Sequence, residues 1–213
     1  MKASLALPEQ RTLLSNVSWG TYERLLSGHL DASTPHFNFD RGVLEIMSPS
    51  SEHEEYKQAL TLLVELLADE LRMDIRNLGS TTFKRNDLER GFEADACFYV
   101  QGAGMIEGKA HIDPAVDPAP DLVIEIEITT PALNKLPIYA AFNVPEVWRW
   151  DGERLILLRL QPLPHGADYA ESQESGVFCN VNAKDLTRLV ERSLSLRRTE
   201  WLPEVRSWVR GLR

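Results

Sequence analysis

Four acidic residues on predicted strands are the first candidates for chemistry. Glu93 and Asp95 alternate with apolar residues in one segment, and Glu125 and Glu127 alternate with isoleucines in another. Alternate residues of a strand share one face, so each pair of carboxylates points to the same side. Burying an unpaired carboxylate is costly. A divalent cation such as Mg²⁺, which binds one or two carboxylates together with waters and phosphate oxygens, would offset that cost. The pattern therefore predicts a metal site.

An alternative explanation of these acidic pairs is a half-exposed antiparallel sheet whose polar face touches water. Two pairs on neighbouring predicted strands, followed by Lys135, favour a site over a wet face. Two more residues are second candidates. Glu45 lies on a predicted hairpin, where it alternates with apolar neighbours, and His53 lies in the first turn of a predicted helix. For His53, a partly exposed polar residue is the competing interpretation.

The elements that must position these residues form an irregular mixture of helices and strands. Apolar residues at helical spacing predict helices at 18–30, 51–71, 136–142, 183–194 and 199–210, with Ser51 as the cap of the second and Asn182 as the cap of the fourth. Alternation of apolar with polar residues predicts hairpins at 37–48 and 146–160 and single strands at 76–85, 92–100 and 121–130. The chain is therefore mixed α/β, with too few strand–helix–strand units for a regular doubly wound fold.

Length and composition set limits on the class of protein. A chain of 213 residues with 43% hydrophobic residues suits one domain, 1–213, with a core at about 15–160 and a helical extension at about 180–213. No uninterrupted apolar run long enough for a membrane span occurs. The N-terminus lacks the pattern of a signal peptide. Two cysteines do not make a disulfide framework, so we expect reduced thiols and a cytoplasmic protein.

The charge of the chain is unevenly distributed. The net charge is −9, which is unusual for a protein that binds nucleic acid. Residues 184–213 contain eight basic and four acidic residues, so this segment carries +4 and leaves −13 for the rest. A basic segment on an acidic body is either a surface that faces phosphates or an ordinary solvated helix face.

Seven short motifs, in a fixed order, carry a resemblance to a known family. They are residues 44–49, 52–54, 79–83, 93–95, 121–125, 135–139 and 144–148. In this order and spacing the chain resembles the Uma-type restriction endonuclease family, which is common in cyanobacteria and belongs to the PD-(D/E)XK nuclease superfamily. The resemblance covers about residues 15–160. It implies a restriction-endonuclease-like mixed β-sheet core flanked by helices, with an N-terminal helix and hairpin and C-terminal helices.

The resemblance also implies a metal-dependent phosphodiesterase site. Asp95 matches the strand aspartate of the superfamily and Glu125 the first acidic residue of its next strand motif. The superfamily usually has lysine two residues later, where this chain has Glu127, so Lys135 becomes the candidate for the amine. We expect Asp95 and Glu125 to bind Mg²⁺ or Mn²⁺. Glu127 would serve as a third ligand or as the base, and Glu45 and His53 are additional site candidates.

The resulting hypothesis is an endonuclease that hydrolyses DNA with the help of a metal ion and acts as a homodimer. Two alternatives stay open. One is a descendant that kept the fold and lost the chemistry, acting as a binding or regulatory protein, as the acidic body and the displaced lysine suggest. The other is a hydrolase of small phosphodiesters, for which an acidic surface is less of a handicap.

Overall fold

The computed structural model describes residues 8–29 and 34–212 and arranges their strands in two sheets. The N-terminal sheet is antiparallel throughout. Its strand order is β1 (Gln10–Leu14), β3 (Val43–Ser48), β2 (His36–Asp40), β6 (Arg90–Glu93) and β5 (Thr82–Arg85). The central sheet is mixed, because β8 and β9 run parallel and its other pairs antiparallel. Its order is β11 (Gly166–Ser172), β10 (Leu155–Leu163), β9 (Glu146–Trp150), β8 (Leu122–Ile126), β7 (Ala96–Tyr99) and β4 (Arg76–Gly79).

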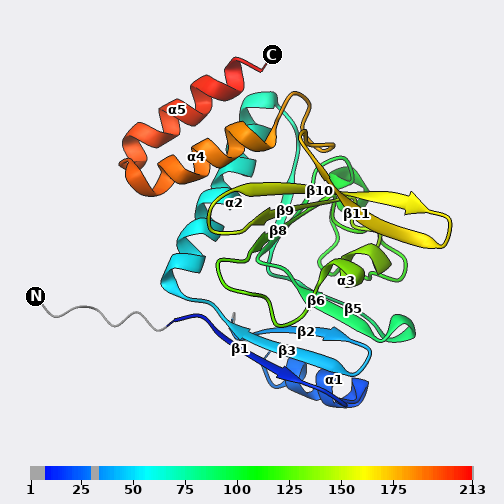
Figure 1. Cartoon of the computed structure of the whole chain (residues 1–213). Coiled ribbons are helices and arrows are strands. Elements are labelled where there is room, and N and C mark those ends of the chain that lie inside the picture. The colour runs from blue at the N-terminus through cyan, green and yellow to red at the C-terminus, as the bar shows by residue number, and fades with distance from the viewer. Residues whose placement is uncertain (1–7, 30–33, 213) are drawn as a thin grey trace, which may run out of the picture.

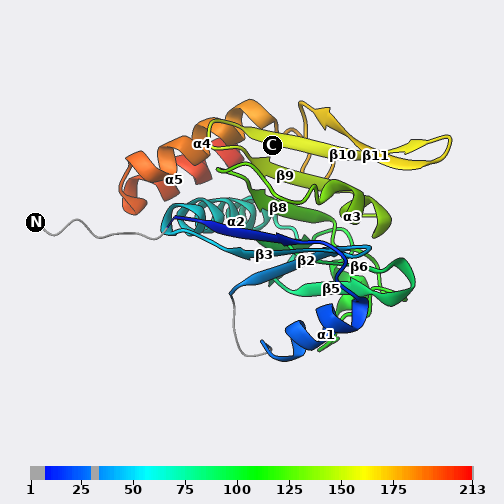
Figure 2. The ribbon, with the colours of Figure 1, turned by 60° about the horizontal axis from the view of Figure 1, so that its bottom comes forward.

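Five α-helices within the described residues cover these sheets. They are α1 (Trp19–Ser27), α2 (Ser51–Leu71), α3 (Leu136–Ala141), α4 (Ala183–Ser195) and α5 (Arg198–Arg210), with short 3₁₀ turns at Asn86–Leu88 and Ala103–Ile106. In Figure 1, α2, α4 and α5 lie together beside the central sheet, while α1 lies against the N-terminal sheet. Figure 2 shows the two sheets one above the other, with α1 on the outer side of the N-terminal one. The expected mixed β-sheet core with flanking helices is confirmed.

Hydrophobic packing fills both faces of the central sheet. One face, with Ile124 and Trp148, packs against α2, α4 and α5. The other, with Val123 and Val147, packs against α3 and the aromatic side chains of β5 and β6. All five residues of β8 are buried. A carboxylate on this strand therefore lies in the interior of the protein, and the half-exposed sheet considered from the sequence does not form here.

Helix α2 connects the N-terminal sheet to the helical layer. Its cap is Ser50, one residue before the expected Ser51, and the Ser50 hydroxyl accepts a hydrogen bond from the His53 backbone N–H at 3.2 Å. The cap of α4 is Asn182, as predicted, and accepts from Asp185 N–H at 2.9 Å.

None of the described helices combines the length and apolar character needed to cross a membrane.

Two segments predicted as single strands are each divided between the two sheets. Residues 76–85 form β4 of the central sheet and β5 of the N-terminal sheet, with a turn at Gly79, whose φ of +55° suits glycine. Residues 92–100 are divided in the same way between β6 and β7, and Ala94 and Asp95 occupy the crossing. Glu93 and Asp95 therefore do not share the face of one strand, because the strand that would have aligned them ends at Glu93.

Two edge strands, β1 and β11, were missed from the sequence. Most residues of β1 are exposed, and β11 alternates only between exposed and partly exposed residues. A strand with no buried face leaves little hydrophobic pattern in its sequence. The omission of β1 matters for function, since this strand and the residue before it reach the candidate site.

Candidate active site

The candidate site is a set of buried polar side chains between the two sheets, which we call the polar seam. Its members, all with described side chains, are Glu9, Arg11, Asn38, Glu45, His53, Asp95, Glu125, Lys135 and Tyr139. They come from both sheets, from the first turn of α2 and from α3. Because buried polar groups are costly unless they are partnered, the partners of each group define what the seam can do.

Asp95 lies at the crossing between the sheets and is 1% exposed. Its Oδ1 contacts His53 Nε2 at 2.8 Å, and its Oδ2 accepts from the Ile126 backbone N–H at 2.7 Å. Burial alone would raise the pKa of Asp95, but the hydrogen bond and charge of His53 and the charge of Lys135 outweigh it and lower the pKa. Asp95 is thus a carboxylate at neutral pH.

His53 is fully buried, so its interpretation as a partly exposed residue was wrong. Its Nε2 faces Asp95 and its Nδ1 contacts Glu9 Oε2 at 2.8 Å. A ring with a carboxylate at each nitrogen must donate from both, so the imidazolium form is favoured. Burial would lower the pKa of His53, but the hydrogen bonds to Asp95 and Glu9 raise it to about 9.

Glu125, on β8, is 2% exposed and directed toward α3. One of its oxygens accepts a hydrogen bond from Lys135 and the other from Tyr139. Burial, assisted by the charge of Asp95, raises the pKa of Glu125 despite the opposing charge of Lys135. Burial would lower the pKa of Lys135, but the charges of Glu125, Asp95 and Glu45 keep it above its ordinary value. Lys135 therefore stays protonated among three acidic groups.

Glu45 also belongs to the seam and is fully buried. Its Oε1 accepts from Arg11 and from the Leu133 backbone N–H, both at 3.2 Å, and its Oε2 accepts from Asn38 Nδ2 at 3.2 Å. The structure thus brings Glu45 close to the same lysine that contacts Glu125, as the charge effect on Lys135 indicates.

Glu127 is the remaining acidic candidate. Strand β8 ends at Ile126, and the Glu127 backbone N–H still donates to the Trp150 carbonyl of β9 at 2.8 Å. Its carboxylate is 3.7 Å from Arg149. Within residues 8–29 and 34–212, no three His, Cys, Asp or Glu side chains lie close enough together to hold one metal ion. Asp95, Glu125 and Glu127 consequently do not form a three-carboxylate group.

Several seam residues were not found from the sequence. Tyr139 follows Lys135 by four residues, a spacing that places both on one side of a helix and was the signal available. Glu9 precedes a strand that leaves no pattern, so no signal pointed to it; its hydrogen bonds, to His53 first, overcome burial and lower its pKa to about 2.

His36 is a further missed residue, at the start of β2 and 1% exposed. Neither ring nitrogen has a hydrogen-bond partner among the described residues, although the Glu93 backbone is near enough to affect the ring. Burial lowers the pKa of His36, opposed by the charge of Asp95 and assisted by those of Lys57 and Lys135.

Other residues with side chains able to bind or react lie outside the seam. Lys84 is exposed and pairs with Glu23 at 2.8 Å. Trp148 and Trp150 are buried in the core beside the helices. Cys97 is buried and Cys179 is exposed, and both are free thiols.

Comparison with known proteins agrees with this architecture. Residues 19–196 match the family model "Uma2: Putative restriction endonuclease". A solved structure from Anabaena variabilis ATCC 29413, described as "a putative nuclease belonging to DUF820", aligns with a TM-score of 0.52 and 13% sequence identity. The alignment covers 87% of this chain and 99% of that one. This likeness shows a shared fold. No curated protein matches the chain. Because the family model spans most of the sequence, including Glu45, Asp95, Glu125 and Lys135, the chain belongs to the Uma2 family.

Proposed function

We propose that this protein is a divalent-metal-dependent endonuclease that hydrolyses phosphodiester bonds in DNA. The observation that carries the proposal is the pair Asp95 and Glu125. These carboxylates are 1% and 2% exposed, and they adjoin a register pair of neighbouring strands, Ala96 with Ile124. Lys135 donates a hydrogen bond to Glu125, and the charges of Glu125 and Asp95 both favour the protonated form of this lysine. The family's description as restriction endonucleases supports the same chemistry.

The donor atoms of Asp95 and Glu125 suit Mg²⁺ or Mn²⁺. Both ions prefer oxygen ligands, and Mg²⁺ completes its shell with waters and substrate phosphate oxygens, so two protein carboxylates are enough. Each of the four carboxylate oxygens accepts one hydrogen bond. A carboxylate oxygen has two lone pairs, so each can accept that bond and still offer a lone pair to a cation.

A bound ion would lower the pKa of a water molecule and offset charge on the phosphate. Side chains of the protein itself would assist this hydrolysis. The Lys135 ammonium group is held at Glu125, where its charge can stabilise negative charge that develops on phosphoryl oxygens. His53 and Tyr139 act as positioning residues, since each fixes the orientation of one acidic ligand. Glu45 contributes a third negative charge near Lys135. We assign Glu127 no part in ion binding.

Calorimetry with Mg²⁺ and Mn²⁺, combined with cleavage of plasmid DNA, tests the proposal. Asp95→Asn and Glu125→Gln should each abolish ion binding and reduce cleavage by at least about 100-fold, while circular dichroism shows an intact fold. Glu127→Gln is the matched control on the same chain segment and should retain both properties within about threefold. Cleavage by Asp95→Asn and Glu125→Gln at the parent rate would refute the assignment.

A second candidate is a family member that binds a partner without catalysis. The observation in its favour is that His53 and Lys135 already compensate the buried charges of Asp95 and Glu125 without an ion. This hypothesis would be favoured if the parent protein binds DNA but shows neither heat of ion binding nor cleavage. Hydrolysis of bis-p-nitrophenyl phosphate without cleavage of DNA would instead identify a small-phosphodiester hydrolase.

The proposal also covers the oligomeric state of the protein and its location in the cell. We propose a cytoplasmic homodimer, because nucleases that cut both strands of a duplex are often dimers and symmetric dimers are the commonest oligomers. Analytical ultracentrifugation with and without duplex DNA tests this part. A monomer under both conditions that still linearises plasmid DNA would contradict it.

A further inference from the structure

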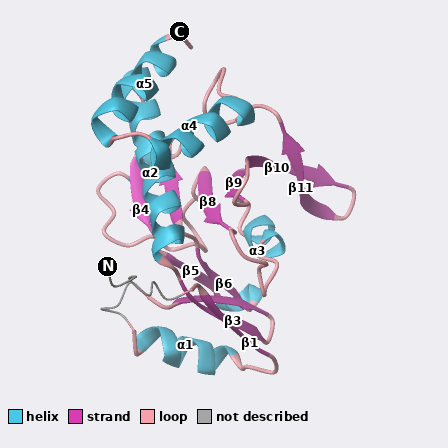
Figure 3. Cartoon of the chain, turned by 60° about the vertical axis from the view of Figure 1, so that its left-hand side comes forward, coloured by secondary structure: helices cyan, strands magenta, loops and turns pink. Residues whose placement is uncertain are grey.

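A polar groove of about 320 Å³ reaches Asp95 from outside the polar seam. It is lined by residues of α2, of β4 and of the start of α5, and Figure 3 shows these elements beside one another. Its most buried lining residues are Asp95 and Ala96, each 1% exposed. Gln58 and Arg198 are exposed members of the same lining. The groove therefore connects the surface with one of the two acids of the candidate site.

Two cationic side chains line this groove. Lys57, on α2, is 16% exposed at its side chain and lies 3.2 Å from Glu54. Arg198, the first residue of α5, is exposed and forms no ion pair with any residue that the structure describes. The lining also contains the acidic Glu65, whose Oε1 accepts from Asn77 Nδ2 at 2.9 Å.

Lys57 also acts on a buried histidine, His36. After burial and the charge of Asp95, the charge of Lys57 is the next influence on His36, whose pKa it helps to lower. Lys57 therefore lies near the interior, while its side chain lines the groove together with Asp95. A lysine on a remote surface would have neither property.

Arg198 lies beyond the part of the chain that matches the family. The match ends at residue 196, and α5 begins at Arg198. Helix α5 is tied to α2 by Arg206 and Arg210, which pair with Glu70 at 2.7 and 2.8 Å. These pairs fasten the later turns of α5 to α2, and Arg198, at the start of α5, lines the groove together with Gln58.

We propose that this groove admits the phosphodiester backbone of a nucleic acid to Asp95, with Lys57 and Arg198 as its phosphate contacts. The inference rests on the proposed nuclease function. A protein with a net charge of −9 repels a polyanion overall, so binding must depend on a few local cations. Two cations on a groove that reaches Asp95 provide this attraction beside one acid of the candidate site.

Fluorescence anisotropy with a labelled 20-base-pair DNA duplex, in EDTA, tests the groove separately from metal-dependent cleavage. Lys57→Gln and Arg198→Gln should each weaken binding about three- to tenfold. Each should also reduce the slope of log Kd against log salt by about 0.9, the value for one duplex phosphate contact. The matched controls are Lys84→Gln and Arg154→Gln, which remove exposed cations elsewhere and should change Kd by less than about twofold.

The outcomes separate the groove from the nuclease function. Groove variants that bind as tightly as the controls, while the parent cuts DNA, would refute the groove and leave the function standing. A parent that binds through Lys57 and Arg198 but never cuts would support the groove and contradict the nuclease. Absence of DNA binding by the parent would overturn the groove proposal, and a cleavage assay on the same preparation would then decide the function on its own.

Discussion

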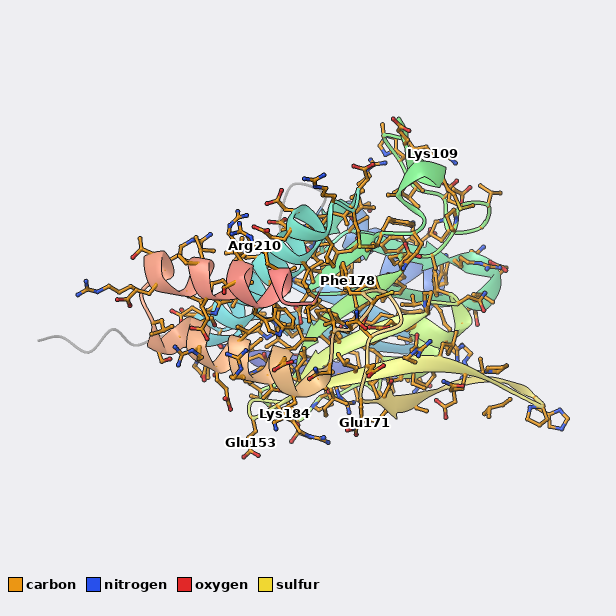
Figure 4. The ribbon with its side chains drawn as sticks, turned by 90° about the horizontal axis from the view of Figure 1, so that it is seen from above. Lys109, Glu153, Glu171, Phe178, Lys184 and Arg210 are labelled. Atoms are coloured by element: carbon orange, nitrogen blue, oxygen red, sulfur yellow. The ribbon has the colours of Figure 1, made fainter. Side chains whose placement is uncertain are left out.

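The two ends of helix α2 carry ionic clusters of different character. At the first turn, His53 is completely buried between Glu9 and Asp95. At the last turn, Glu70 accepts hydrogen bonds from Arg206 and Arg210, whose side chains are 40% and 63% exposed. Figure 4 labels Arg210 where α5 passes over α2. Acidic side chains thus meet a buried histidine at one end of the helix and water-exposed arginines at the other.

This difference separates an ionic cluster suited to chemistry from one that fastens a helix. In the seam, water is excluded, so each charge depends on its protein partners and pKa values move strongly. At the other end, water and salt weaken every pair. The expected basic surface of residues 184–213 is partly neutralised in this way, since Arg188 and Arg192 also pair with Glu204.

The largest effect should follow from removing the seam lysine. Lys135→Met leaves the Glu125 carboxylate buried with Tyr139 as its remaining side-chain donor, and the free energy of unfolding should fall by about 3–5 kcal/mol at pH 8. At pH 5.5 the loss should be smaller, because Glu125 can then take up a proton. Urea unfolding at both pH values measures the change.

Lys84→Met provides the matched control, since it removes an exposed lysine paired with Glu23. Its effect should stay within about 0.5 kcal/mol at both pH values. Equal effects of the two substitutions would show that the seam is accessible to water and would remove the contrast between the two ends of α2.

A smaller effect, with a defined pH window, should come from His53. Its pKa in the folded protein is about 9, above the ordinary 6.5. A raised pKa stabilises the fold fully below pH 6.5, and this stabilisation is lost as the pH rises through 9. The contribution is about 3 kcal/mol, from about 1.4 kcal/mol per pKa unit. The parent should therefore lose stability between pH 6.5 and 9 relative to His53→Gln in urea titrations.

The control for this prediction is His165→Gln, which changes an exposed histidine between β10 and β11. Its stability should follow the parent at every pH. If the profiles of the parent and His53→Gln run parallel from pH 6 to 9, His53 is not the imidazolium that its two carboxylate neighbours imply.

The sequence was sufficient to predict the strand with Glu125 and the helix with His53. These predictions depended on patterns within one element, where periodicity of apolar residues is strong. Proximity of Asp95 to Glu125 followed from the family resemblance. Each of these residues lies on or beside an element with a large buried face.

The rest depended on relations between elements that no local pattern records. The crossing at Asp95 interrupts an apolar run without any glycine or proline to mark it, so residues 92–100 looked like one strand. Glu9 reaches His53 from 44 residues away in the sequence, through an edge strand with little apolar content. The contact of Glu127 with Arg149 depends on the pairing of β8 with β9, two strands that are separated by α3 in the sequence.

A moderate effect should come from the cap that holds the buried end of α2. Ser50→Ala removes the acceptor of the His53 backbone N–H and should lower the free energy of unfolding by about 1 kcal/mol. Ser51→Ala, one residue later and exposed, is the matched control and should change it by less than about 0.3 kcal/mol. The reverse ranking would restore Ser51 as the cap expected from the sequence. Thermal and urea unfolding measure both.

The smallest effect should appear at the exposed end of α2. Arg210→Gln removes one of the two arginines on Glu70 and should lower the Tm by about 1–2 °C at low ionic strength, because Arg206 keeps the carboxylate paired. In about 0.5 M NaCl the difference should vanish, since salt screens exposed pairs. The effect of Lys135→Met should persist in the same buffer. A Tm difference for Arg210→Gln that is unchanged by salt would mean that α5 shields this pair from solvent, and both ends of α2 would then be protected ionic clusters.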